Sequence, residues 1–133
     1  MKKMFVTALN CMDGRVQEPL IDWAKQYLQT SYVDMITEPG VDRFFCRKDQ
    51  LEPGTIFEKI TISTEQHGSD SVIVAGHHDC AGHPVSDEQH RQDVHHSIQN
   101  LKERFPDIRW IGLFIDSNWE VELLVDTSDQ DAL

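Results

Sequence analysis

The stretch that decides the fold is residues 72–82, which have the sequence VIVAGHHDCAG. The apolar residues Val72 to Ala75 predict a buried strand, and Gly76 ends it. Two histidines, an aspartate and a cysteine follow directly. His77 and Cys80 lie three positions apart in a turn, a spacing that lets both side chains reach one metal ion. Because zinc needs three or four protein ligands, a second segment must supply another ligand.

Such a segment lies near the N-terminus. Residues 4–9 form an apolar run that predicts a buried first strand, and Cys11 follows it closely. In an open α/β sheet, binding sites lie beyond the carboxyl ends of the strands, where the strand order reverses. If the strands at 4–9 and 72–75 are neighbours at that point, Cys11, His77 and Cys80 meet in one crevice, as two thiolates and an imidazole do in catalytic zinc sites. The alternative is that Cys11 is a small buried apolar residue and His77 a loop histidine with a local partner.

The rest of the chain alternates helical and strand patterns. Amphipathic helices are predicted from Pro19 to Leu28, from Ile56 towards Gly68, and between a Ser86 cap and Pro106. Strands are predicted at 32–37, 109–115 and 119–123, the last two as an antiparallel hairpin, and a loop at 41–52. These elements predict an α/β fold of three layers: a mainly parallel sheet of four strands with an antiparallel edge strand, and helices on both faces.

Length and charge limit the function further. The 133 residues suit one zinc-binding α/β domain at 1–125, followed by an acidic, flexible and solvated tail at 126–133. The net charge of −11 argues against a nucleic-acid partner, which needs a basic face. The chain has no apolar run long enough for a membrane span and no signal-peptide pattern, so we expect a cytoplasmic protein without membrane contact. Three cysteines, an odd number, suit reduced or metal-bound thiols better than disulfides.

The two ligand segments resemble a known family. Residues 11–15, CMDGR, and residues 76–80, GHHDC, are similar to the two zinc motifs of the β-class carbonic anhydrases. The resemblance implies zinc held by Cys11, His77 and Cys80, with water as the fourth ligand and Asp13 and Arg15 as a paired dyad. It also implies a homodimer or a higher homo-oligomer. Of the motif that the family has after its second strand, this chain keeps only the glycine, at position 40.

The chemistry expected of these residues is hydration. Bound zinc lowers the pKa of its water to about 7, and the resulting hydroxide attacks carbon dioxide to give bicarbonate, reversibly. Asp13 can accept the hydrogen bond of that water, and Arg15 can hold Asp13 ionised. The alternatives are a zinc hydrolase of another small electrophile, or a non-catalytic zinc-binding or redox-sensing protein in which Asp13 takes the fourth position. A solvated ion pair is the plain interpretation of Asp13 and Arg15.

Other polar residues receive weaker expectations. His78 is expected to face outward, and Asp79 and His83 to lie at the surface, with a supporting or proton-transfer role as the alternative. Cys46 is expected to be a free thiol, and the tryptophans to be core or interface residues. Three histidines of the third helix lie outside its apolar stripe and are expected to be exposed: His90, His95 and His96.

Overall fold

The computed structural model describes residues 3–51 and 53–128. Its single five-stranded sheet has the order β2-β1-β3-β4-β5. The strands are β1 (Lys3–Asn10), β2 (Thr30–Thr37), β3 (Ser71–His77), β4 (Arg109–Ile115) and β5 (Val121–Asp126). The pairs within β1 to β4 are parallel, whereas β5 is antiparallel to β4. The predicted sheet, four parallel strands and an antiparallel edge strand, is therefore confirmed.

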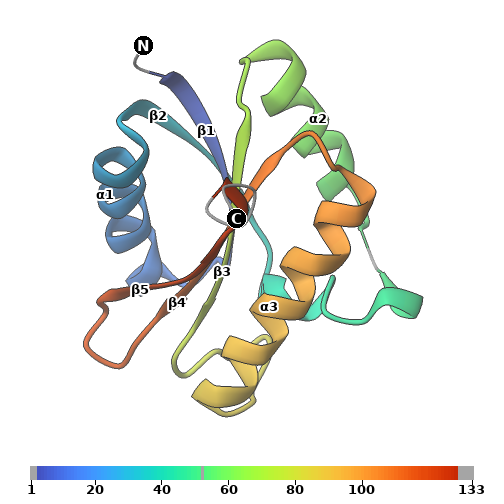
Figure 1. The fold of residues 1–133 in the computed structure, drawn as a ribbon. Helices are drawn as coiled ribbons and strands as arrows, with labels where there is room; N and C mark the ends of the chain where they lie inside the picture. The colour runs from blue at the N-terminus through green and yellow to red at the C-terminus, as the bar shows by residue number, and fades with distance from the viewer. Residues whose placement is uncertain (1–2, 52, 129–133) are drawn as a thin grey trace.

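The helices cover both faces of this sheet. They are α1 (Gln17–Leu28), α2 (Ile56–Gln66) and α3 (Asp87–Arg104). Figure 1 shows α1 on one side of the sheet and α2 and α3 on the other, so the predicted three layers are confirmed. Every residue of β3 is buried, because helices cover both its faces. The continuous apolar run of this strand in the sequence has the same cause.

Two hydrophobic cores fill the spaces between the layers. The core under α1 includes Val6, Leu20, Ala24, Ile73 and Leu113. The core under α2 and α3 includes Leu9, Phe45, Val74, Ile98 and Trp110. Burial of this apolar surface stabilises the sheet. None of the helices in the described part of the chain has the length and apolar character that crossing a membrane requires.

Some element boundaries differ from the predicted ones. The fifth strand begins at Val121, because Trp119 lies in the preceding turn with a φ of +60° and cannot continue an extended strand. The predicted loop at 41–52 contains two short 3₁₀ helices, η2 (Val41–Arg43) and η3 (Lys48–Gln50). Ser86 caps α3 as predicted, since its Oγ accepts a hydrogen bond of 3.1 Å from the amide of Gln89.

The start of the predicted tail is wrong. Asp126 is the last residue of β5 and its side chain is fully buried. It accepts hydrogen bonds from Arg109 at 2.6 and 3.0 Å and from the Tyr27 hydroxyl at 2.7 Å. Thr127 is buried as well. The folded unit therefore extends past residue 125, and residues 129–133 of the predicted tail lie outside the described part of the chain.

Candidate metal centre

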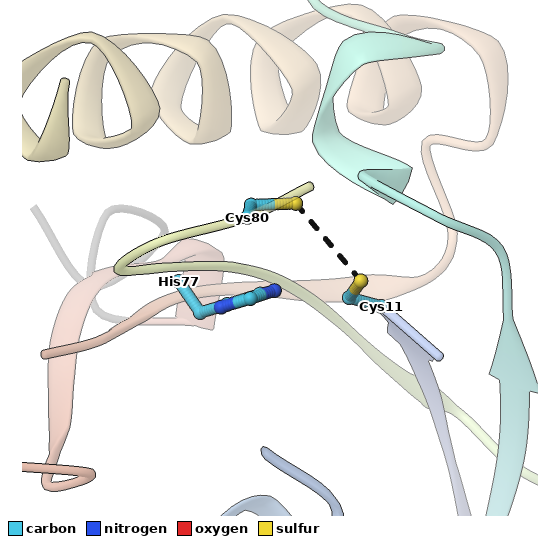
Figure 2. A group of neighbouring side chains, drawn as sticks. All are labelled: Cys11, His77 and Cys80. Carbon is cyan, nitrogen blue, oxygen red and sulfur yellow. Dashed lines mark hydrogen bonds between the residues drawn. The ribbon is translucent and has the colours of Figure 1, made fainter. Parts of the chain in front are cut away.

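The sheet topology brings the two ligand segments together. Strands β1 and β3 are neighbours in the sheet. The strand order reverses at this point, because β2 lies on one side of β1 and β3 on the other. Cys11 follows β1 directly, His77 is the last residue of β3, and Cys80 lies in the loop beyond it. The three side chains point toward one another (Figure 2), with one donor atom of each within 4.8 Å of the others. We call these three residues the thiolate centre.

The spacing of the sulfur atoms fits one tetrahedral ion. The Sγ atoms of Cys11 and Cys80 are 4.0 Å apart. With zinc–sulfur bonds of about 2.3 Å, two sulfurs on one tetrahedral zinc lie about 3.8 Å apart. Both cysteines are free of disulfides and buried. The pair is therefore arranged as two ligands of one metal would be.

The imidazole of His77 fits the same group. Its Nδ1 lies 2.7 Å from the carbonyl oxygen of His78. A carbonyl only accepts, so Nδ1 carries the hydrogen and Nε2 holds the lone pair. Nε2 is buried and has no hydrogen-bond partner among the described residues. Burying such a lone pair without a partner costs about 1–3 kcal/mol, a cost that a metal ligand would avoid. The donor set and this orphaned nitrogen fit a zinc ion.

The surroundings of the two thiols shift their pKa values in opposite directions. The amide of Gly40 donates to Cys11 Sγ at 3.4 Å. The pKa of Cys11 is lowered, chiefly by the hydrogen bond from Cys80 and against the effect of burial, with the Gly40 and Asp13 amides also contributing. The pKa of Cys80 is raised, because the Cys11 thiolate and burial both disfavour a second charge. A divalent ion would favour deprotonation of both sulfurs.

The geometry of the Gly40 turn explains why only glycine fits there. Its φ is +59°, a conformation that other residues rarely adopt. A Cβ at this position would lie 2.7 Å from the carbonyl carbon of Gly82. The turn after β2 can therefore pack directly against the loop that holds Cys80, which places its amide on the Cys11 sulfur.

The Asp13 and Arg15 side chains form the expected pair. Arg15 donates to Asp13 from Nε at 3.0 Å and from Nη2 at 2.7 Å, and its backbone amide donates at 2.9 Å. The Arg15 hydrogen bonds lower the pKa of Asp13 to about 2 despite partial burial. The Arg15 guanidinium also binds Asp79 and lies 4.5 Å from the ring centroid of Trp119. A supporting role for Asp79 was the alternative expected from the sequence, whereas the contact with Trp119 of the β4–β5 hairpin was not predicted.

Four other histidines, at positions 78, 90, 95 and 96, differ in their surroundings. His78 stands apart from the thiolate centre, because its Nδ1 bonds the Asp87 carboxylate at 2.9 Å. His95 and His96 are exposed, as expected. The expectation for His90 is wrong: its side chain is fully buried, and its Nδ1 lies 2.6 Å from Asp42 Oδ2. Position 90 is four residues before Val94, so extending the apolar stripe of α3 back by one turn would have found it.

Known proteins were compared with this chain by sequence and by fold. The sequence model of a family described as "Putative carbonic anhydrase" matches residues 1–125. The chain belongs to this carbonic anhydrase family. The match confirms the resemblance that residues 11–15 and 76–80 indicated. No curated protein matches the sequence.

Solved structures share the fold of this carbonic anhydrase family member at low identity. A β-carbonic anhydrase isoform of Trichomonas vaginalis has a TM-score of 0.66 at 14% identity, over 94% of this chain and 85% of that one. A carbonic anhydrase of Streptococcus mutans has a TM-score of 0.63 at 18% identity, over 93% and 84%. The apo form of a carbon disulfide hydrolase has a TM-score of 0.59 at 13% identity, over 91% and 78%. The predicted fold class, that of the β-class enzymes, is therefore confirmed.

Proposed function

We propose that this protein binds zinc through Cys11, His77 and Cys80 and catalyses the reversible hydration of carbon dioxide to bicarbonate. The observation that carries the proposal is the buried Nε2 of His77, which has no partner among the described residues and lies beside two cysteine sulfurs that are 4.0 Å apart. Membership of the carbonic anhydrase family supports the choice of reaction. When bound, zinc supplies a water whose pKa is lowered to about 7, and thus hydroxide near neutral pH.

The proposed role of Asp13 is to orient the attacking water. With a pKa of about 2, its carboxylate stays ionised at neutral pH and accepts hydrogen bonds. The same low pKa makes Asp13 a poor proton acceptor, since a general base works best when its pKa is near the working pH. Asp13 therefore fixes the direction of a lone pair, and the released proton passes to buffer.

The proposed role of Arg15 is to hold that carboxylate in place. Its guanidinium contacts both oxygens of Asp13 and is itself held by Asp79 and by the Trp119 ring. Charge-assisted bonds to both oxygens restrict rotation of the carboxylate. They also oppose the alternative in which Asp13 turns away from Arg15 to take the fourth ligand position.

A second candidate is hydrolysis of another small linear electrophile. The fold is shared with a carbon disulfide hydrolase, which supports this class of substrate. The same zinc ligands would serve in either reaction, with the pocket choosing the substrate. Parallel assays with carbon dioxide and carbon disulfide distinguish the two candidates.

The proposal includes a cytoplasmic homodimer or higher homo-oligomer. The absence of disulfides at all three cysteines is consistent with a reducing compartment. Exposed apolar side chains on the two strands at one side of the sheet, Met4 on β1 and Tyr32 on the edge strand β2, support contact with a second chain. Light scattering after size-exclusion chromatography tests the oligomer, and a monomer at micromolar concentration would contradict it.

Metal analysis combined with stopped-flow hydration tests the activity. We expect one zinc per thiolate centre and a hydration rate above that of buffer. Cys80→Ala should release this zinc and abolish the rate. Cys46→Ala is the matched control, because Cys46 lies outside the thiolate centre and bonds only the Arg43 carbonyl among the described residues. Full zinc occupancy without hydration would favour a non-catalytic zinc protein, and a protein that binds no zinc would refute the proposal.

A further inference from the structure

A second group of metal-binding side chains lies beside the thiolate centre. Asp42 belongs to η2, His83 to the loop before α3, and His90 and Asp93 to α3. We call these four residues the imidazole cluster. One donor atom each of Asp42, His83 and His90 lies within 4.8 Å of the others. These residues have no part in the proposed hydration reaction.

The imidazole of His90 has the same unusual feature as that of His77. Its Nδ1 lies 2.6 Å from Asp42 Oδ2, and an ionised carboxylate only accepts, so Nδ1 carries the hydrogen. The lone pair is then on Nε2, which is buried and has no partner among the described residues. His77 and His90 are the two histidines with such a nitrogen in that part of the chain. The signature that marks a ligand of the thiolate centre therefore recurs at His90.

The second imidazole is positioned by another carboxylate. Nε2 of His83 lies 2.6 Å from Asp93 Oδ2. Histidines that bind metals commonly donate their other ring nitrogen to a carboxylate, which fixes the orientation of the ring. In each imidazole of the cluster, one ring nitrogen bonds a carboxylate. The other ring nitrogen takes no part in that bond.

The separation of the two rings fits one shared ion. The ring centroids of His83 and His90 are 5.0 Å apart, with an interplanar angle of 87°. A metal–nitrogen bond of about 2.1 Å puts an ion about 3.2 Å from a ring centroid, so two imidazoles on one tetrahedral ion have centroids about 5.2 Å apart. The observed centroid distance therefore agrees with the distance that a shared ion requires.

The charge of the cluster also calls for a cation. The side chains of Asp42 and Asp93 are 1% and 9% exposed. Among the described residues, their ion-pair partners are histidines and include no lysine or arginine. Two buried carboxylates without a permanent cation are costly. Burial, and then the charges of Asp93 and Asp42, raise the pKa of the nearby Cys46 thiol, which agrees with a negative potential in this region.

We propose that His83 and His90 bind a second divalent transition-metal ion through the ring nitrogens that do not bond Asp42 and Asp93, and that these two carboxylates orient the rings. Imidazole donors suit zinc, copper, iron or nickel in the divalent state. The ion would link the loop before α3 to α3 itself, and the bond between Asp42 and His90 would connect η2 to the site. Because His83 is 17% exposed, the site opens to solvent on its side.

Cobalt(II) binding tests this site separately from the thiolate centre. Wild-type protein should bind two equivalents, one for each group of donors, and show the strong near-ultraviolet absorption of cobalt bound to thiolate. Cys80→Ala should bind one equivalent without that absorption. His83→Ala should also bind one equivalent but keep the absorption in full. His96→Ala, an exposed histidine on α3, is the matched control and should still bind two.

His83→Ala is a better test of this site than His90→Ala. His90 is fully buried, so its replacement can unfold the protein, whereas the partly exposed His83 is easier to truncate. The retained thiolate absorption then shows that the fold is intact. One equivalent in wild-type protein, or two in His83→Ala, would overturn the proposal. Neither result depends on whether the thiolate centre hydrates carbon dioxide.

Discussion

The thiolate centre and the imidazole cluster are neighbours that are held together by different means. The rings of His77 and His90, one from each group, stack with centroids 6.4 Å apart. In the thiolate centre, strand ends and backbone groups fix the ligands: the His78 carbonyl holds His77, and the Gly40 amide holds Cys11. In the imidazole cluster, side chains from three segments hold one another. A site built on strand ends is fixed by the sheet, whereas a site built from side-chain bonds depends on how distant segments pack.

The largest effect expected is that of His77→Ala. This change removes one of three ligands in the thiolate centre, so the zinc should be lost and hydration should fall to the buffer rate. The imidazole cluster keeps all its residues in this variant. Zinc content and stopped-flow rates measure the effect, with His96→Ala as the exposed control. Retention of both zinc and rate would show that the buried Nε2 of His77 is not a ligand.

Asp13→Ala should lower the hydration rate less than His77→Ala does. Residues that orient a metal-bound group through hydrogen bonds typically contribute about 10- to 100-fold to activity. We expect a loss of that size in hydration with zinc retained, because Asp13 orients the water and is not a ligand. Metal analysis and kcat/KM measure the two effects separately. Loss of zinc in Asp13→Ala would instead make Asp13 the fourth ligand.

Asp126→Asn tests the contrast between buried carboxylates. Asp126 has a permanent cation partner in Arg109, whereas the ion-pair partner of Asp42 among the described residues is His90. The Arg109, Tyr27 and Ser128 bonds outweigh burial and hold the pKa of Asp126 below its ordinary value. A depressed carboxyl pKa stabilises the fold above the unfolded value of about 3.9 and loses that contribution as the pH falls below it.

We therefore expect Asp126→Asn to lower the free energy of unfolding by about 2 kcal/mol at neutral pH, a value discounted because Arg109 is partly exposed. The difference from wild type should shrink below about pH 4. Urea unfolding at both pH values, with and without added zinc, measures it. If the decrease in the free energy of unfolding of Asp126→Asn changed with added zinc, the assignment of Arg109 as the partner of Asp126 would be contradicted.

Gly76→Ala should have the smallest effect and should act on the imidazole cluster. A Cβ at this position would lie 2.9 Å from Asp42 Oδ2 and 3.2 Å from His90 Nδ1. Displacing this buried pair should cost about 1–2 kcal/mol. Gly14→Ala is the control for stability, because no atom lies within 4 Å of its added Cβ. Equal unfolding midpoints for the two variants would show that the pair has room to move.

The sequence was sufficient to predict the sheet and the thiolate centre, because both depend on local patterns. The apolar runs before Cys11 and His77 mark buried parallel strands, and parallel strands place their carboxyl ends at one edge. The imidazole cluster could not be predicted in the same way. Asp42 lies in a segment without periodicity, and its partnership with His90 spans 48 positions along the chain. Burial of a polar side chain is decided by the partner that packing supplies, and a single sequence does not show that partner.

Trp119 and Asp126 show the same limit at the other end of the chain. Alternation of polar and apolar residues predicted a strand over 119–123, but Trp119 has a left-handed backbone and stacks on Arg15 instead. The acidic composition after residue 125 predicted a solvated tail, but Asp126 is buried and pairs with the partly exposed Arg109. In both cases the side chain contacts an arginine that local sequence patterns do not reveal.

The rate of carbon dioxide hydration by zinc-loaded protein, followed by stopped flow across pH, tests the proposed activity most directly. Two thiolates offset the charge of zinc, so its water should be less acidic than one held by three neutral histidines. We predict a rate above that of buffer which rises with pH above about 7. A rate equal to that of buffer at neutral and alkaline pH, with zinc fully bound, would contradict the assignment of hydration to the thiolate centre.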